Sequence, residues 1–249
     1  MADKKVAFVT GGVGGIGSAI CEELEAKGNK VVAGYHPMEK DRAEEMLKAW
    51  KDAGKDIDII EGDITDYDVC TNMAAEIKEK HGVVQILVNC AGITKDRSFK
   101  KMPKADWDAV LTVNLDGAFN VTKQFVEGMM AEGFGRIVNI SSVNGKKGQF
   151  GQCNYAASKA GLHGFTMALA QEVVRKGVTV NTIAPGYIET EMTAKIADDI
   201  KTAIISEIPA GRMGKPDEVA HMVGFLADER AAFITGANFS INGGQFISF

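Results

Sequence analysis

Residues 6–20 read Val6-Ala-Phe-Val-Thr10-Gly-Gly-Val-Gly-Gly15-Ile-Gly-Ser-Ala-Ile20. The first five residues are mostly apolar and predict a buried strand, and the last five predict the start of a helix. The glycines between them permit a tight turn that brings the main chain close to a pyrophosphate at the helix N-terminus. Two patterns of dinucleotide-binding turns fit, Gly12-x-Gly14-x-x-Gly17 and Thr10-Gly11-x-x-x-Gly15-x-Gly17. The stretch therefore predicts a nucleotide-binding strand, turn and helix.

The alternation of strand and helix continues along the chain. Runs rich in Val, Ile and Leu predict seven strands, at 6–10, 30–34, 56–61, 86–89, 136–140, 178–183 and 238–241. Amphipathic stretches predict six helices between them, at 16–27, 39–53, 68–81, 104–130, 152–176 and 216–227. Nearly continuous apolar strands are typical of a parallel sheet that is buried on both faces. We therefore expect an α/β protein with a doubly wound parallel sheet and helices on both faces.

The composition predicts one globular domain spanning residues 1–249. The chain is 45% hydrophobic and 24% charged, which is enough for one large core and excludes a disordered chain. Its net charge of −5 argues against nucleic-acid binding. No stretch approaches the ~18 apolar residues of a membrane span. The cysteines at 21, 70, 90 and 153 lack metal-binding spacing. We expect them to be buried and reduced, in a cytoplasmic protein with no metal and no membrane partner.

Residues 189–212 interrupt the alternation of strands and helices. They are helical in character, but Pro185-Gly186 and Pro209 bound them. Ligands of open α/β sheets bind outside the carboxyl ends of the strands, and this segment follows such an end. A substrate-binding lid at about 189–212 is therefore expected, with an ordinary pair of surface helices as the alternative.

The second predicted strand ends without an acidic residue. An NAD site usually has a carboxylate about 20 residues after the glycines, whereas the chain here has no acid between Val31 and Glu39. The end at Gly34-Tyr35 leaves room for a 2′-phosphate, with which Lys40 or Arg42 can pair. NADPH is therefore the expected cofactor. The alternative for the two cations is a solvated helix face.

Three residues predict the chemistry, namely Ser142, Tyr155 and Lys159. Tyr155 and Lys159 are four residues apart, so they share one face of a helix. A neighbouring ammonium lowers the pKa of a phenol, and a change of about three units corresponds to roughly 4 kcal/mol. Such a phenol can protonate a ketone oxygen as hydride reaches the carbon, while Ser142 binds the same oxygen. The Tyr-x-x-x-Lys pair is weak evidence alone and becomes informative together with the glycine turn.

Over essentially its whole length the chain resembles the short-chain dehydrogenase/reductase family. The matching motifs are Thr10-Gly11-x-x-x-Gly15-x-Gly17, Asp63, Asn89-Cys90-Ala91-Gly92, Asn114, Ser142, Tyr155-x-x-x-Lys159 and Pro185-Gly186-x-x-x-Thr190. The resemblance implies a single Rossmann-type domain with seven parallel strands, usually assembled as a homotetramer. Cys90 departs from the family's usual pattern, which has asparagine at this position, and so loses an amide that normally braces the turn.

The resemblance also implies roles for individual residues. Ser142, Tyr155, Lys159 and Asn114 would be catalytic, with Asn114 supporting a water-mediated proton relay through Lys159. Asp63 would bind the adenine, Asn89 the adenosine, and Ile188 and Thr190 the carboxamide. With the glycine turn and the second strand, the expected cofactor-binding residues are Thr10, Gly11, Gly12, Gly15, Ile16, Gly17, Tyr35, Lys40, Arg42, Asp63, Asn89, Ala91, Gly92, Tyr155, Lys159, Pro185, Gly186, Ile188 and Thr190.

Within the family, the chain is most similar to members that reduce acetoacetyl-CoA with NADPH. Residues 136–152, the segment from Gly92 to Asp96, and Tyr187 carry this likeness. It implies a substrate-binding set of Asp96, Gln149, Phe150, Gln152 and Tyr187. Amide side chains suit the amides of pantetheine, and aromatic rings supply contact area. The alternative for the two glutamines is an exposed loop.

Reductases that act on 3-oxoacyl groups carried by acyl carrier protein are the alternative. Carrier proteins are acidic and favour a basic docking surface. Here Glu127 and Glu132 lie in a stretch with no cation between Lys123 and Arg136, so a CoA thioester is the preferred partner. A nucleotide sensor without turnover would not need the catalytic residues, whereas a secondary alcohol dehydrogenase would share them.

Two remaining features are assigned to packing. The histidines at 36, 81, 163 and 221 are scattered, and none is given a catalytic role. His163 follows Lys159 by four residues, and core or subunit packing is expected for it. The apolar end at 243–249 is expected to lie in a subunit interface.

Overall fold

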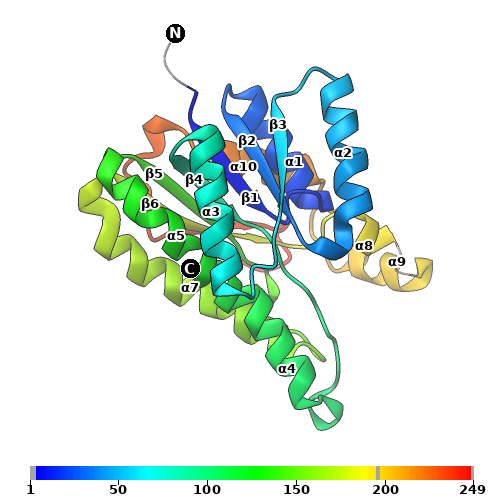
Figure 1. Cartoon of the computed structure of the whole chain (residues 1–249). Coiled ribbons are helices and arrows are strands. Elements are labelled where there is room, and N and C mark those ends of the chain that lie inside the picture. The colour runs from blue at the N-terminus through cyan, green and yellow to red at the C-terminus, as the bar shows by residue number, and fades with distance from the viewer. Residues whose placement is uncertain (1–3, 195–196, 248–249) are drawn as a thin grey trace.

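A parallel seven-stranded sheet forms the centre of the computed structural model, which describes residues 4–194 and 197–247. The strands are β1 (Val6–Thr10), β2 (Lys30–Tyr35), β3 (Ile57–Glu61), β4 (Val84–Asn89), β5 (Gly135–Ile140), β6 (Val178–Pro185) and β7 (Asn238–Ile241). Their order is β3-β2-β1-β4-β5-β6-β7 (Figure 1). All seven predicted strands are confirmed. The order reverses between β1 and β4, which places the ligand crevice of such a sheet at the carboxyl ends of these two strands.

Helices cover both faces of the sheet, as predicted. Outside residues 188–214, the helices of eight or more residues are α1 (Gly15–Ala26), α2 (Lys40–Asp52), α3 (Tyr67–His81), α4 (Lys104–Leu111), α5 (Gly117–Glu132), α7 (Cys153–Val173) and α10 (Pro216–Leu226). One core cluster joins the sheet to α1, α2 and α10. A second joins its other face to α3, α5 and α7 (Figure 1). No helix in the described part of the chain is long and apolar enough to cross a membrane.

The predicted helix over 104–130 is confirmed as continuous helical backbone, but it is not a uniform α-helix. A π-helical turn, Thr112–Asp116, separates α4 from α5. Asn114 lies in this turn and is buried, and its side chain makes two hydrogen bonds to the main chain of Ile93. Such turns often occur at functional sites. The polar contacts of Asn114 depend on a distant loop, so the local apolar pattern did not reveal the turn.

The cysteines are only partly as expected. Cys21 and Cys70 are free and buried, but Cys90 is half-buried and Cys153 is exposed. Cys153 is the first residue of α7, where the chain leaves a surface loop, so its side chain has no core to enter.

The segment predicted to be a lid, residues 189–212, begins and ends at neighbouring positions in the structure. A parallel bridge pairs Ile188 with Gly214, and the Glu189 amide donates to the Gly214 carbonyl at 2.8 Å. Between these points lie the short helices α8 (Glu191–Ala194) and α9 (Asp198–Ser206). The two ends of this segment are therefore paired with each other. The segment follows β6, at the end of the sheet where the crevice is expected. Its action as a lid stays a prediction.

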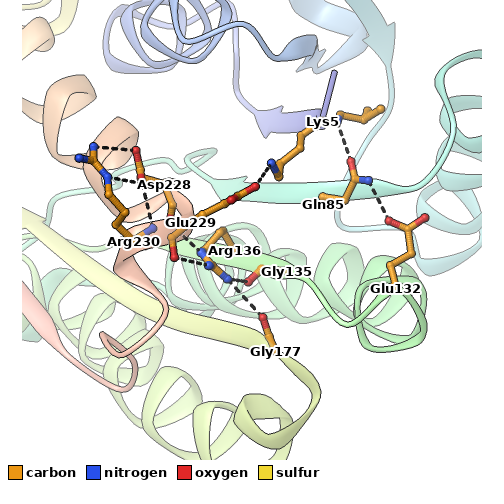
Figure 2. A network of polar contacts seen from close by, with 10 residues as sticks. Lys5, Gln85, Glu132, Gly135, Arg136, Gly177, Asp228, Glu229 and Arg230 are labelled. Atoms are coloured by element: carbon orange, nitrogen blue, oxygen red, sulfur yellow. Dashed lines mark hydrogen bonds and ion pairs between the residues drawn. The ribbon is translucent and has the colours of Figure 1, made fainter. Parts of the chain in front are cut away.

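A buried arginine holds the opposite end of the sheet together (Figure 2). Arg136, at the start of β5, donates to four main-chain carbonyls, those of Gly135, Gly177, Asp228 and Glu229. Its guanidinium carbon lies 4.3 Å from the centre of the Phe134 ring. The side chain thus connects β5 to the loop before β6 and to the segment after α10.

The C-terminal segment is half-buried at Gly244, Gln245 and Phe246 and exposed at Gly243 and Ile247. Ile247 is 80% exposed. Residues 248–249 lie outside the described part of the chain, and the predicted interface role of residues 243–249 stays a prediction.

Candidate active site

The glycine turn packs too closely for side chains. A Cβ atom on Gly17 would lie 2.1 Å from the carbonyl oxygen of Gly11, and one on Gly12 would lie 2.7 Å from Cβ of Ala33. Gly11 has a φ of +62°, which favours glycine. The residue before α1 is Gly14, which has no side chain to cap the helix, and the first turn has no acidic residue. The N-terminus of α1, where Ile16 lies, therefore offers its main-chain N–H groups to an anion.

Thr10 braces the two strands that border the crevice. Its hydroxyl oxygen accepts hydrogen bonds from the main-chain amides of Cys90 (3.0 Å) and Ala91 (3.1 Å). The side chain is buried and joins the end of β1 to the end of β4. It therefore fixes the walls of the crevice, and any contact with a cofactor has to involve its main chain.

Asn89 is directed into the protein rather than into the crevice. Its amide nitrogen donates to Thr122 Oγ1 at 2.9 Å and to Asn139 Oδ1 at 2.8 Å. Asn139 in turn donates to Thr166 Oγ1, so this buried network spans β4, β5, α5 and α7. The amide nitrogen of Asn89 is thus engaged in the core, and its Oδ1 is buried without a hydrogen-bond partner among the described residues, so the predicted adenosine contact falls to its main chain. The sequence analysis missed Asn139 and Thr166, although a polar Asn139 inside an apolar strand was a signal.

The end of β2 differs from a simple phosphate pocket. Tyr35 is buried, and its hydroxyl lies 3.4 Å from Glu61 Oε2. Lys40 is exposed at the start of α2. Arg42 binds Glu191 of α8 with both terminal nitrogens, at 2.6 and 3.0 Å. The Glu191 carboxylate, which was not predicted from the sequence, therefore pairs with the guanidinium that was expected to bind a phosphate.

Asp63 lies close to the end of β2. Its Oδ2 is 3.7 Å from His36 Nε2, and its Oδ1 accepts from the amide and hydroxyl of Thr65. Burial raises the pKa of Asp63, but the bonds from Thr65 and the nearby His36 outweigh burial and hold the pKa below its usual value. A charged acceptor is therefore available beside the predicted adenine site.

The end of β6 meets the glycine turn. Pro185 ends the strand, and the Gly186 amide donates to the Ile241 carbonyl at 2.9 Å. Ile188 is buried. Thr190 lies over Gly15, because a Cβ on that glycine would be 3.0 Å from the Thr190 side chain. These predicted carboxamide contacts are therefore near the predicted pyrophosphate contacts.

The three chemistry-bearing residues come together from β5 and α7. Ser142 follows β5, and its hydroxyl oxygen accepts from the Asn144 amide at 3.1 Å. Tyr155 and Lys159 lie on α7, and Ser142 is close enough to Tyr155 to lower the pKa of the phenol. The Lys159 ammonium is buried, donates to the Ile140 carbonyl at 2.8 Å, and lies 5.8 Å from the centre of the Tyr155 ring.

The electrostatics of this group differ from the expectation. Burial raises the pKa of Tyr155, the hydrogen bond from Ser142 lowers it, and Asp96 and Cys90 raise it further, so that the net change is upward. Burial lowers the pKa of Lys159 to about 8. The prediction that Lys159 lowers the pKa of Tyr155 is therefore wrong for this structure, because desolvation disfavours the charged form of both groups.

The buried Lys159 predicts an unusual dependence of stability on pH. Its pKa is about 8 in the folded protein and near the usual 10.5 in the unfolded chain. Between these values the unfolded chain binds more protons, so the free energy of unfolding rises with pH, by up to about 1.4 kcal/mol per pH unit. Denaturant titrations of the cofactor-free protein from pH 6 to 10.5 should show this rise relative to Lys159→Met. If the free energy of unfolding changed with pH in the same way in both proteins, the lowered pKa of Lys159 would be contradicted.

Asn114 and Lys159 contact the same loop. A Cβ on Gly92 would lie 3.2 Å from both Asn114 Oδ1 and Lys159 Nζ. Asn114 also donates to Ser158 Oγ at 3.1 Å, a contact that the sequence analysis missed. Burial raises the pKa of the Cys90 thiol to about 11 although Lys159 opposes this. Cys90 therefore stays protonated beside the lysine.

A chain of polar side chains lies beside Ser142. Asn144 Nδ2 donates to Gln152 Oε1 at 2.9 Å, and Gln152 Nε2 donates to Asp96 Oδ2 at 2.8 Å. Asp96 also raises the pKa of Tyr187, after burial and Glu207, so these groups are near one another. The sequence analysis predicted Asp96, Gln152 and Tyr187 but missed Asn144.

The other two predicted substrate residues are on the surface. Gln149 is exposed and accepts from Lys147 Nζ at 3.4 Å, and Phe150 is 88% exposed. They lie on the loop before α7, next to Gln152. The structure thus brings three of the five predicted substrate residues together and leaves these two at the rim.

The chain is similar to known proteins over most of its length. The family model described as short chain dehydrogenase matches residues 5–201. An acetoacetyl-CoA reductase from Allochromatium vinosum is 55% identical, over 98% of this chain and 99% of its own length. An acetoacetyl-CoA reductase from Cupriavidus necator is 53% identical, over 97% and 98%. The 3-oxoacyl-[acyl-carrier-protein] reductase FabG from Haemophilus influenzae is 42% identical, over 98% and 99%.

Proposed function

The chain belongs to the short-chain dehydrogenase family, and on that premise we propose that it reduces acetoacetyl-CoA to 3-hydroxybutyryl-CoA with NADPH. The observation that carries the proposal is the meeting of Ser142, Tyr155, Lys159 and Asn114 beside the crevice between β1 and β4. The relatives named acetoacetyl-CoA reductase, at 53 to 55% identity, support the choice of substrate over the more distant carrier-protein reductase at 42%.

The residues of the crevice fit a dinucleotide. The cradle at Gly11, Gly12 and Gly17 leaves no space for a Cβ, and the uncapped N-terminus of α1 suits a pyrophosphate. Asp63 is held ionised beside the place expected for the adenine, and Thr190 lies over the glycine turn. When bound, the cofactor supplies hydride to the ketone carbon of the substrate.

The side chains of this chain supply the proton and hold the ketone oxygen. The raised pKa of Tyr155 keeps its phenol protonated at neutral pH, so it can donate a proton to the oxygen as negative charge develops there. The Ser142 hydroxyl accepts from the Asn144 amide and, when the ketone is bound, can donate its own proton to the same oxygen.

Lys159 is suited to returning a proton to Tyr155. With a pKa of about 8, its ammonium can lose and regain a proton near neutral pH. Asn114 fixes the Ile93 loop and Ser158 around it.

The preference for NADPH is proposed to depend on Arg42. Replacing Arg42 by alanine should raise KM for NADPH about tenfold and leave KM for NADH unchanged, because only NADPH carries the 2′-phosphate. Glu191 binds Arg42 through both terminal nitrogens, so Glu191→Gln should lower KM for NADPH. Lys48→Ala, an exposed lysine on the same helix, is the matched control. Equal effects of Arg42→Ala on the two cofactors would exclude this role.

We also propose a cytoplasmic homotetramer. Four unpaired cysteines suit a reducing compartment. Large apolar side chains, Phe119 on α5 and Met167 on α7, are about half exposed, which is typical of a surface that another subunit covers. Light scattering of the purified protein tests the assembly, and a monomer at assay concentration would contradict it.

Initial rates decide the substrate. The protein should oxidise NADPH with acetoacetyl-CoA and be slower both with NADH and with acetoacetate carried on acyl carrier protein. A large preference for the carrier-bound substrate would instead favour a 3-oxoacyl-[acyl-carrier-protein] reductase. Such a preference would direct attention to Arg175 and Lys176 as a docking patch.

A further inference from the structure

Three consecutive residues at the end of β5 face helix α7. The Ile140 carbonyl accepts from Lys159 Nζ at 2.8 Å, and Ser142 is close enough to Tyr155 to lower its pKa. Between them, Ser141 Oγ lies 2.8 Å from the Lys159 carbonyl oxygen. Ser141 is buried and is not among the residues assigned to catalysis. Its hydroxyl therefore ties the main chain of α7 at Lys159 to the segment after β5 that contains Ser142.

A histidine completes this contact. His163 Nε2 lies 2.8 Å from Ser141 Oγ. A carbonyl oxygen can only accept, so the single hydroxyl proton of Ser141 is used in the bond to Lys159. His163 Nε2 must then donate to Ser141, which requires a proton on that nitrogen.

The surroundings of His163 keep the ring neutral. Burial, followed by the nearby Lys146, lowers the pKa of His163 to about 4. Lys146 is on the short helix α6 (Asn144–Lys147) and donates to Ser240 of β7 at 2.9 Å. At neutral pH the ring therefore carries one proton, on Nε2, and Nδ1 is an acceptor.

We propose that His163 and Ser141 are positioning residues for the reduction, an inference that rests on the proposed function. The Nε2–H group of His163 holds the Ser141 hydroxyl in the rotamer that donates to Lys159. That bond sets the position of Tyr155 and Lys159 relative to Ser142. Neither residue touches the reacting atoms, but catalysis is sensitive to displacements of about 1 Å at such groups.

Kinetics of matched variants test the proposal. We expect His163→Leu to lower kcat for acetoacetyl-CoA about tenfold with little change in its KM, and His163→Gln, which keeps a donor, to recover most of the loss. Ser141→Ala should lower kcat by a similar factor. The double variant of Ser141→Ala and His163→Leu should lower kcat no further, because both residues act through the same hydrogen bond. His221→Leu, an exposed histidine on α10, should match wild type. Unchanged kcat in His163→Leu, equal losses in the leucine and glutamine variants, or additive losses would each overturn the proposal.

A second measurement does not depend on the reaction. In ¹⁵N-histidine NMR at pH 7, the signals that disappear in His163→Leu identify the His163 ring. Their chemical shifts should be those of a neutral ring protonated on Nε2, and Ser141→Ala should change these shifts. A ring protonated on Nδ1 alone overturns the proposal. If wild type does not reduce acetoacetyl-CoA but the Nε2–H tautomer and its dependence on Ser141 are found, the proposed function fails while the hydrogen-bond assignment stands.

Discussion

Replacing Tyr155 by phenylalanine should lower kcat for acetoacetyl-CoA reduction about a thousandfold and leave NADPH binding within about twofold. The variant removes one oxygen atom, the proton donor, and keeps the ring that packs on α7. Proton transfer by a positioned side chain is worth about 10²–10⁴ in rate. Binding should persist because the glycine cradle and the N-terminus of α1 do not involve the phenol.

Two measurements separate the chemistry from binding. Steady-state rates give kcat, and fluorescence titration gives the affinity of each protein for NADPH. Tyr67→Phe is the matched control, because it removes the same atom from a more exposed tyrosine at the start of α3 and should change neither quantity. Residual activity of Tyr155→Phe above a tenth of wild type would show that another group protonates the ketone.

The sheet was predictable because its signals are local. Each strand is a short apolar run, and glycines occupy the turn after β1 where any side chain would collide, as the 2.1 Å separation at Gly17 shows. The spacing of apolar residues and the residue types of a turn depend only on residues that are neighbours in the sequence. They can therefore be recognised before the fold is known. The same reasoning placed Tyr155 and Lys159 on one face of a helix, and both lie on α7.

The parts that sequence reasoning missed depend on distant partners. The π turn at Asn114 is associated with hydrogen bonds to Ile93, and the pKa of Lys159 depends on its burial against β5. The side chain of Asn89 is engaged by Asn139 and Thr122. None of these contacts leaves a periodic signal. Residue type alone therefore predicted which side chains meet at Tyr155 but gave the wrong direction for its pKa.

Arg136→Met should lower the free energy of unfolding by about 3 kcal/mol. The guanidinium reaches four carbonyls on three separate segments, which a fork of five donors can do and an unbranched side chain cannot (Figure 2). Burial lowers the pKa of Arg136, while Glu229 and Asp228 oppose this, so the charge is partly compensated. Lys5 pairs with Glu229 at 2.6 Å beside it, which holds that acid in place.

The competing effect is the cost of burying a charge. Where this cost dominates, an apolar replacement of similar length is neutral or stabilising. Here hydrogen bonding should dominate, because Nε and both terminal nitrogens of Arg136 bind carbonyls and the Phe134 ring lies 4.3 Å from the guanidinium carbon. Denaturant unfolding of Arg136→Met and Arg136→Lys distinguishes the two cases. The lysine variant keeps the charge but loses the fork, so it should also be destabilised.

Arg230 provides the matched control for Arg136. It is an arginine in the same network, but its side chain is 91% exposed and pairs with Asp228 at 3.0 Å. An exposed ion pair contributes about 0–1 kcal/mol, so Arg230→Met should change stability little. Both variants should keep kcat at 25 °C, because Arg136 lies at the start of β5, whereas the crevice is expected at the carboxyl ends of the strands. A stability of Arg136→Met equal to that of wild type would mean that desolvation of the guanidinium cancels its four hydrogen bonds.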